Sequence, residues 1–193
     1  MAGVPVVVVE GDLTRARWTV GVDQVAGARL AVHHLLDLGH REIVHLAGPP
    51  DWAEARARED GWRQEMAAAG LRPAEPVHGD WSADYGYRAG SRIAADTAVT
   101  AVFTANDQIA IGLLLALHEA GRRVPQDVSV VGFDDEPAAA YLVPPLTTVR
   151  QDFAAVGRRA IQTITAAIAG SDVDPPGLLQ PDLILRRSTA PAG

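Results

Sequence analysis

The chain has 193 residues, and its 48% hydrophobic and 21% charged content is typical of a globular protein of one or two domains. It contains no cysteine and no lysine, because all 17 basic residues are arginine. Disulfides, thiolate metal sites, Schiff-base lysines and phosphate-binding Walker loops are therefore excluded. The formal net charge of -7 argues against binding of DNA by this chain itself, since phosphate neutralisation requires a basic surface.

Two features of the sequence favour the cytoplasm as the location of the protein. No run of apolar residues is long enough to span a bilayer, so no membrane association is expected. The first five residues also lack the basic start of a secretory signal. The six histidines show no His-Glu-x-x-His spacing, and the sequence predicts neither a metal site nor a cofactor.

Short apolar runs alternate with helical patterns along the chain. In chain order we expect a strand at 6–9, a helix at 25–38, a strand at 43–47, a helix at 54–69, a strand at 76–78, a helix at 82–95 capped by Ser82, a strand at 99–104, a helix at 107–120, strands at 128–133 and 146–149, a helix at 153–169 and a strand at 178–185. Repeated strand–helix units of this spacing predict an α/β fold with a parallel sheet between layers of helices.

Polar or aromatic side chains, or glycine, follow five of the expected strands. The residues concerned are Glu10, Gly11 and Asp12; Gly48; Asp80 and Trp81; Asn106 and Asp107; and Asp134 and Asp135. Ligands bind at the carboxyl ends of strands in open α/β sheets. A tryptophan that stacks on a sugar ring, beside carboxylates, an amide and a guanidinium that bind hydroxyls, suits a polyhydroxylated small molecule. The alternative is that these Asp and Asn residues cap the helices that follow.

Adjacent carboxylates allow a different interpretation, in which Asp134 and Asp135 form an acid–base pair or bind Mg²⁺ in an enzyme. No nucleophile or phosphate loop accompanies them, so we expect a protein that is not an enzyme. The remaining tryptophans, Trp18, Trp52 and Trp62, are expected to pack in the protein rather than to bind a ligand.

A series of motifs spans nearly the whole chain. They are Val22-Asp-Gln-Val-Ala-Gly-Ala-Arg-Leu30, Leu38-Gly-His-Arg-Glu-Ile43, Leu46-Ala-Gly-Pro49, Ala55-Arg-Ala-Arg58, Gly61-Trp62, Gly79-Asp-Trp81, Ala105-Asn-Asp107, Val124-Pro-Gln-Asp127, Val131-Gly-Phe-Asp-Asp135, Pro144-Pro-Leu-Thr-Thr148, Gln151-Asp-Phe153 and Arg186-Arg-Ser-Thr189. On these motifs the chain resembles the effector-binding core of the lac repressor and purine repressor family of bacterial transcription regulators.

The resemblance implies a fold of two lobes, like that of type I periplasmic binding proteins. Residues 23–150 and 181–193 would form the C-terminal lobe, and residues 1–22 and 151–180 the remnant of an incomplete N-terminal lobe. Family members begin with a DNA-binding helix-turn-helix, a hinge helix and two further strand–helix units. These precede the region matched here, so we expect the chain to be N-terminally truncated.

The resemblance also implies a function and a set of site residues. Arg58 matches the arginine that binds the ligand, Trp81 the aromatic wall, Asn106 the amide and Asp134 the carboxylate; Phe153 falls at an apolar wall from the other lobe, and Glu10 near a ligand carboxylate. The expected function is sensing of an effector, a sugar rather than a purine, by a homodimer that contacts its partner around Tyr141 and Leu142. Ligand-controlled lobe closure would then alter operator binding by the absent N-terminal domain. The alternatives are a sugar-binding protein of a transport system and a carbohydrate-processing enzyme.

Overall fold

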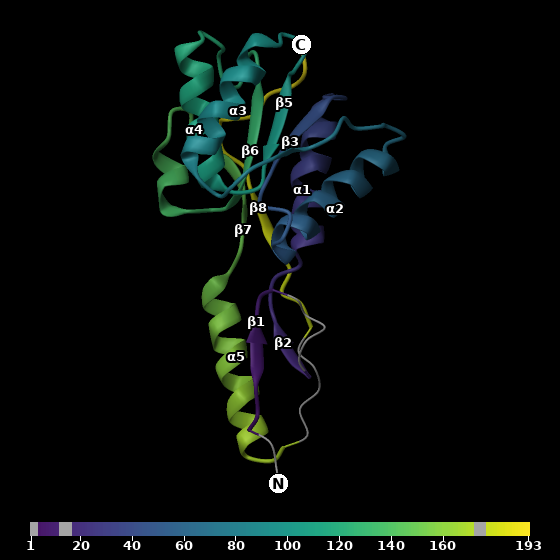
Figure 1. The fold of residues 1–193 in the computed structure, drawn as a ribbon, viewed down its shortest axis with the longest axis vertical. Coiled ribbons are helices and arrows are strands. Elements are labelled where there is room, and N and C mark those ends of the chain that lie inside the picture. Colours follow the sequence, from purple (N-terminus) through teal and green to yellow (C-terminus); the bar gives the residue numbers. More distant parts are fainter. Residues whose placement is uncertain (1–3, 12–16, 172–176) are drawn as a thin grey trace. The chain divides into compact units, whose positions relative to one another are not determined.

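In a computed structural model of the protein, residues 4–11, 17–171 and 177–193 are described. The chain divides into two compact units (Figure 1). The first unit consists of Met1–Asp23 and Gln151–Pro181, and the second of Gln24–Arg150 and Asp182–Gly193. No helix among the described residues has both the length and the apolar character needed to cross a membrane.

A single six-stranded sheet forms the centre of the second unit. Its strands are β3 (Ile43–Ala47), β4 (Val77–His78), β5 (Ala101–Thr104), β6 (Ser129–Asp134), β7 (Thr147–Arg150) and β8 (Asp182–Ile184). They lie in the order β4-β3-β5-β6-β7-β8, and all neighbours are parallel except β7 and β8. The predicted α/β class is confirmed. The direction of β8 was not predicted, because the chain reaches this strand from the first unit rather than through a helix packed on the same sheet.

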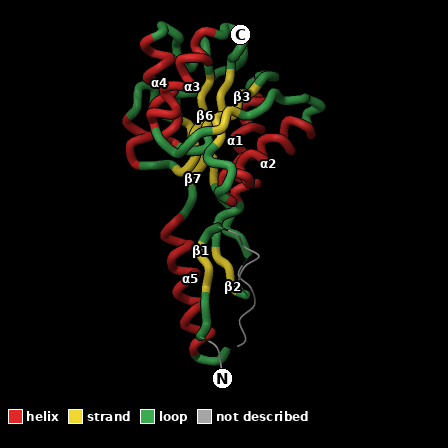
Figure 2. Tube along the Cα trace, viewed as in Figure 1, coloured by secondary structure: helices red, strands yellow, loops and turns green. Residues whose placement is uncertain are grey.

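Helices cover both faces of this sheet. On one face lie α1 (Gln24–Asp37) and α2 (Ala53–Ala68), and on the other lie α3 (Ala83–Ala95) and α4 (Asp107–Glu119), as Figures 1 and 2 show. Successive strand residues point to opposite faces, so Val102 and Val130 pack with α3 and α4, whereas Phe103 and Phe133 pack with α1 and α2. Burial on both faces explains why these strands are continuous apolar runs.

The first unit contains a smaller set of elements. Strands β1 (Val7–Val9) and β2 (Trp18–Val20) pair in parallel, and α5 (Phe153–Ile168) packs against both. Its core cluster consists of Val20, Val22 and Val156. The sequence did not predict β2. The exposed apolar side chains of α5 include Phe153 at 55% and Ile168 at 70%.

Most expected elements are present, with ends that differ by one or two residues. Two differences are larger. A short 3-10 helix, η1 (Pro137–Tyr141), follows β6 where no helix was expected. The strand expected at 178–185 is reduced to β8, and Leu179 instead forms a bridge with Val22 in the first unit. Pro181 accounts for the interruption, because proline donates no hydrogen bond to a ladder.

Candidate functional site

Four of the six predicted site residues come together in the second unit, at the carboxyl ends of its parallel strands. Trp81 follows β4, Asn106 follows β5, Asp134 ends β6, and Arg58 lies on α2. Strand order reverses here, because β4 lies on one side of β3 while β5 lies on the other. Such a switch point leaves a crevice between the loops that leave the two neighbouring strands, where ligands bind in open α/β sheets.

Arg58 is the residue that links this group. Its side chain is buried, with the residue only 5% exposed. The Nε group donates to Oε1 of Gln24 at 2.9 Å, and Nη1 donates to the Ala105 carbonyl. Nη2 lies 3.4 Å from Oδ1 of Asp134, and the guanidinium lies 4.0 Å from the Phe133 ring centroid. A guanidinium held on several sides presents a fixed fork of donors.

Trp81 forms an aromatic wall beside Arg58. The Arg58 guanidinium carbon lies 5.6 Å from the Trp81 ring centroid. The ring packs on Gly48 at the end of β3, where any side chain would collide with it. Its Nε1 group is buried and has no hydrogen-bond partner among the described residues. A buried N–H without a partner is costly.

Asn106 caps a helix, which was the alternative interpretation of these polar positions. Its Oδ1 accepts from the backbone N–H of Ile109 at 2.8 Å at the start of α4. Its Nδ2 group donates to the Trp81 carbonyl at 3.1 Å. The same side chain therefore fixes both α4 and the loop that carries the aromatic wall. A direct contact of Asn106 with ligand remains a prediction.

The two adjacent carboxylates have separate partners. Asp134 has a backbone φ of 110°, and its side chain, 21% exposed, faces Arg58. Asp135 accepts from Arg150 Nε at 2.6 Å and from Arg186 Nη2 at 2.6 Å. Burial alone would raise the pKa of Asp135, but the two arginines outweigh it and lower the pKa. Because Asp135 is committed to this structural clamp, it is not available as the second member of an acid–base pair.

Asp107 supports the turn that carries Asp134, a role that the sequence did not reveal. Its carboxylate accepts from the Thr148 hydroxyl at 2.6 Å and from the Glu136 N–H at 2.8 Å. Gly132 has no side chain where this carboxylate packs. Burial raises the pKa of Asp107 to about 7. From the sequence Asp107 is an ordinary acidic residue in a first helical turn, and nothing local indicates its burial.

The other two predicted residues belong to the first unit. Glu10 has a φ of 59°, and its Oε1 accepts from the Val22 N–H at 3.0 Å within that unit. Phe153 is the first residue of α5. Their contacts with a ligand remain predictions, and Asp12, which follows the same strand as Glu10, lies outside the described residues.

His45, Trp62 and Trp52 differ in their burial and in their contacts. The described residues contain no group of three side chains placed to hold a metal ion. His45 is buried against Phe103, with ring centroids 4.7 Å apart, and burial lowers its pKa to about 3. Trp62 packs in the core and donates to the Ile43 carbonyl at 3.0 Å, as predicted. Trp52 does not, because it is 52% exposed and lies edge-on to Trp81.

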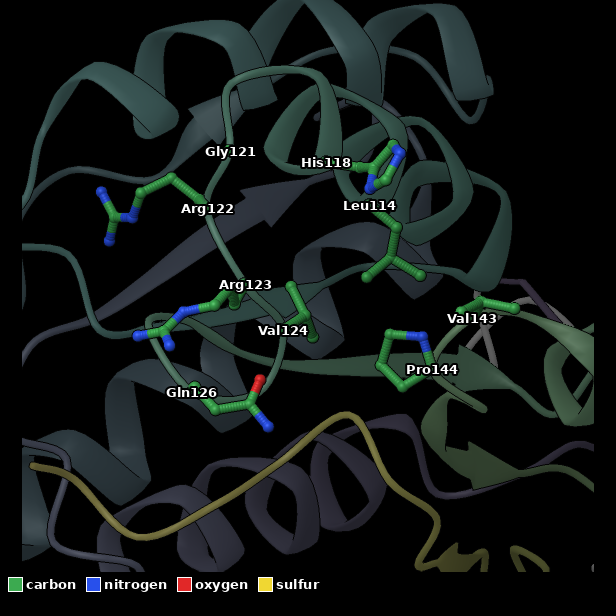
Figure 3. A pocket seen from close by; sticks show the side chains of 9 residues that line it. All are labelled: Leu114, His118, Gly121, Arg122, Arg123, Val124, Gln126, Val143 and Pro144. Carbon is green, nitrogen blue, oxygen red and sulfur yellow. The ribbon is translucent and has the colours of Figure 1, made fainter.

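A cavity of about 450 Å³ lies elsewhere in the second unit, at the other end of α4 (Figure 3). Leu114 and His118 of α4, Val124 and Pro144 are among its lining residues. Asn106 and His118 are 12 positions apart, so at 1.5 Å per residue the backbone positions of these two residues are separated by roughly 18 Å along α4. The cavity therefore contains none of the predicted ligand residues.

Comparison with known proteins places this geometry in a family. Residues 32–189 match the periplasmic binding protein-like domain. A structure of a dimeric lac repressor with a C-terminal deletion aligns with a TM-score of 0.91 and 34% identity, covering 97% of this chain and 70% of that one. The chain belongs to the lac repressor and purine repressor family. The fold expected from the motifs is thereby confirmed.

Two named members of the family are similar in sequence to most of this chain. The lactose operon repressor of Escherichia coli (strain K12) is 38% identical over 164 residues, which are 84% of this chain and 46% of the relative. The HTH-type transcriptional regulator CelR of Thermobifida fusca is 37% identical over 174 residues, or 88% of this chain and 51% of the relative. The chain thus spans about half the length of these curated relatives. A structure of a CelR–cellobiose complex aligns with a TM-score of 0.86 and 34% identity, covering 94% of this chain and 58% of that one.

Proposed function

We propose that this chain is the effector-sensing and dimerisation module of a bacterial transcription regulator and that its effector is a sugar. The protein would act in the cytoplasm and would not catalyse a reaction. The observation that carries the proposal is the group formed by Arg58, Trp81, Asn106 and Asp134 at the carboxyl ends of the sheet. An indole beside a carboxylate, an amide and a guanidinium offers a stacking surface and hydroxyl partners together. Relatives that match include the lactose operon repressor and the transcriptional regulator CelR, and one related structure is that of a CelR–cellobiose complex.

The proposal includes Phe153 and Glu10 of the first unit as further ligand contacts. A ligand bound by residues of both units would favour one arrangement of the units through its different contacts in each arrangement. A dimer would pass this change to DNA-binding domains, and operator DNA would be bound only by those domains. The net charge of -7 agrees with the proposal that operator DNA is bound by other domains and not by this chain.

Dimerisation is proposed to use the surface around Tyr141 and Leu142. Tyr141 is 86% exposed and Val143 is 94% exposed, whereas Leu142 between them is partly buried against the core. Large apolar side chains that are exposed close together in the chain are typical of surfaces that bind another protein. Light scattering at micromolar concentration should therefore report a dimer, and a monomer would contradict this part of the proposal.

A tryptophan fluorescence titration tests the ligand class. A panel of sugars should quench or shift the emission more than hypoxanthine or guanine does, because a sugar would stack on Trp81. Trp81→Phe should lose most of that response. Trp62→Phe is the matched control and should keep it, because Trp62 lies in the core. A response to purines alone would reverse the assignment of the ligand as a sugar.

A further inference from the structure

Trp52 is an aromatic side chain that the core does not explain. It is 52% exposed and belongs to none of the hydrophobic clusters of the second unit. Its contact with another aromatic ring is with Trp81, with centroids 5.9 Å apart and planes at 78°. The partner is therefore the aromatic wall of the candidate site.

Tryptophan is also an unfavourable residue type at the position that Trp52 occupies. It is the N-cap residue of α2, with φ −88° and ψ 132°, and its side chain provides no capping hydrogen bond. Ser, Thr, Asp and Asn are preferred at such positions because they satisfy a free N–H of the first turn. A residue that breaks a local rule without a packing reason is typical of a functional position.

The loop that carries Trp52 is held in place by its own backbone. The Trp52 N–H donates to the Pro49 carbonyl at 3.1 Å, and Nη1 of Arg56 donates to the Pro50 carbonyl at 2.9 Å. Two prolines further restrict the backbone of this loop. The indole is thus presented from a preorganised loop, which lowers the entropy cost of binding.

Trp81 is the neighbour that Trp52 and Arg58 share. The Arg58 guanidinium and the Trp52 ring both lie against the Trp81 ring. Arg58 and Asp134, which form an ion pair, are predicted to contact the first sugar ring of the ligand. The Trp52 ring stands at 78° to the Trp81 ring and therefore presents a second, separate aromatic face next to the first.

The charges around the two indoles restrict the ligand further. Asp51 and Asp80 are exposed and precede Trp52 and Trp81 directly. The guanidinium of Arg56, the cation of this loop, is held on the Pro50 carbonyl. The Asp80 carboxylate accepts from the Ser82 N–H at 2.9 Å and from the Ser82 hydroxyl, so it is held in the turn before α3. Both carboxylates add negative charge to the loops that carry the two indoles, and negative charge there disfavours a phosphate group. A neutral saccharide therefore fits this surface better than a sugar phosphate.

We propose that Trp52 forms a second subsite, so that the effector is a neutral disaccharide or longer saccharide with one ring at Trp81 and the next at Trp52. This inference rests on the proposed function, because it places a second ring next to the first. The chemistry required is stacking of an apolar sugar face on the Trp52 indole.

Calorimetric titration of the intact protein with matched sugars tests the subsite, using glucose with cellobiose and galactose with lactose. The unsubstituted protein should bind at least one disaccharide about tenfold or more tightly than its monosaccharide, an effect expected of one added stacked ring. Trp52→Ala should remove that difference and leave monosaccharide affinity and the melting temperature unchanged. Trp52→Phe, which keeps an aromatic face, should restore much of the difference.

Two results would overturn the proposal in distinguishable ways. Trp52→Ala with unchanged disaccharide affinity, or with equal losses for both sugars of a pair, would remove the second subsite while the sugar-sensing function stands. No binding of any mono- or disaccharide by the unsubstituted protein would overturn the proposed function and the subsite together.

Discussion

The second unit covers both faces of a six-stranded sheet with helices, whereas the first unit covers a two-stranded sheet with α5. The second unit has two core clusters that contain large side chains such as Trp62, Phe103 and Phe133. The cluster of the first unit contains Val20, Val22 and Val156. Apolar burial is the main stabilising contribution, so the two units should differ strongly in stability.

This difference bears on where binding residues are placed. Arg58, Trp81, Asn106 and Asp134 are all carried by the unit with the larger core, and hydrogen bonds or ion pairs fix three of them there. A site gains affinity when its groups are held rigidly before the ligand arrives. The first unit leaves Val6, Ile161 and Ile168 among its exposed apolar residues.

The largest expected difference between the units is in core substitutions. Phe103→Ala removes a fully buried ring from the second unit and should lower the free energy of unfolding by about 3–5 kcal/mol. Val156→Ala in the first unit removes two methyl groups and should cost about 1.6 kcal/mol, at about 0.8 kcal/mol for each carbon. Urea unfolding monitored by circular dichroism compares the two. Equal costs would show that the first unit is packed as firmly as the second.

The second prediction concerns Asp107, whose pKa of about 7 in the folded protein exceeds its ordinary value of 3.8. Between these values the unfolded chain releases the proton while the folded chain retains it. The contribution of Asp107 to stability therefore falls as pH rises from about 4 to 7 and is constant above that. From pH 5 to pH 8 the loss should be about 2–3 kcal/mol, at 1.36 kcal/mol per pH unit.

Asp107→Asn isolates this effect, because asparagine keeps the shape of the side chain and does not titrate. Stability curves at pH 5 and pH 8 should differ by about 2–3 kcal/mol less in the variant than in the unsubstituted protein. Hydrogen exchange should assign the change to amides of α4 rather than α5, because Asp107 lies in the second unit. An identical pH dependence in both proteins would show that Asp107 is ionised throughout this range.

Much of the second unit could be predicted from its sequence, because strands buried on both faces are continuous apolar runs and glycines mark the helix ends. The gathering of Trp81, Asn106 and Asp134 also followed from the pattern, since parallel strands end at one edge of a sheet. Strand β2 and the direction of β8 could not be predicted. The direction of β8 depends on a path through the other unit.

The contacts within the site depend on side-chain placement, which spacing along the chain does not encode. The pairing of Arg58 with Asp134, and that of Asp135 with Arg150 and Arg186, join residues far apart in sequence. Trp52 was expected to pack, because tryptophan side chains are highly buried on average. Its exposure became evident only from the fold.

Calorimetric titration of Asp134→Asn with the sugar that gives the largest fluorescence response tests the central claim most directly. Asparagine tolerates the positive φ of 110° at this position better than alanine does, so the backbone turn should persist. The variant keeps an acceptor oxygen but loses its charge, and a charge-assisted hydrogen bond is roughly twice as strong as a neutral one, so affinity for the sugar should fall by about 0.75–1.5 kcal/mol, which is about three- to tenfold. An unchanged affinity, with an unchanged melting temperature, would remove Asp134 from the site and contradict the account.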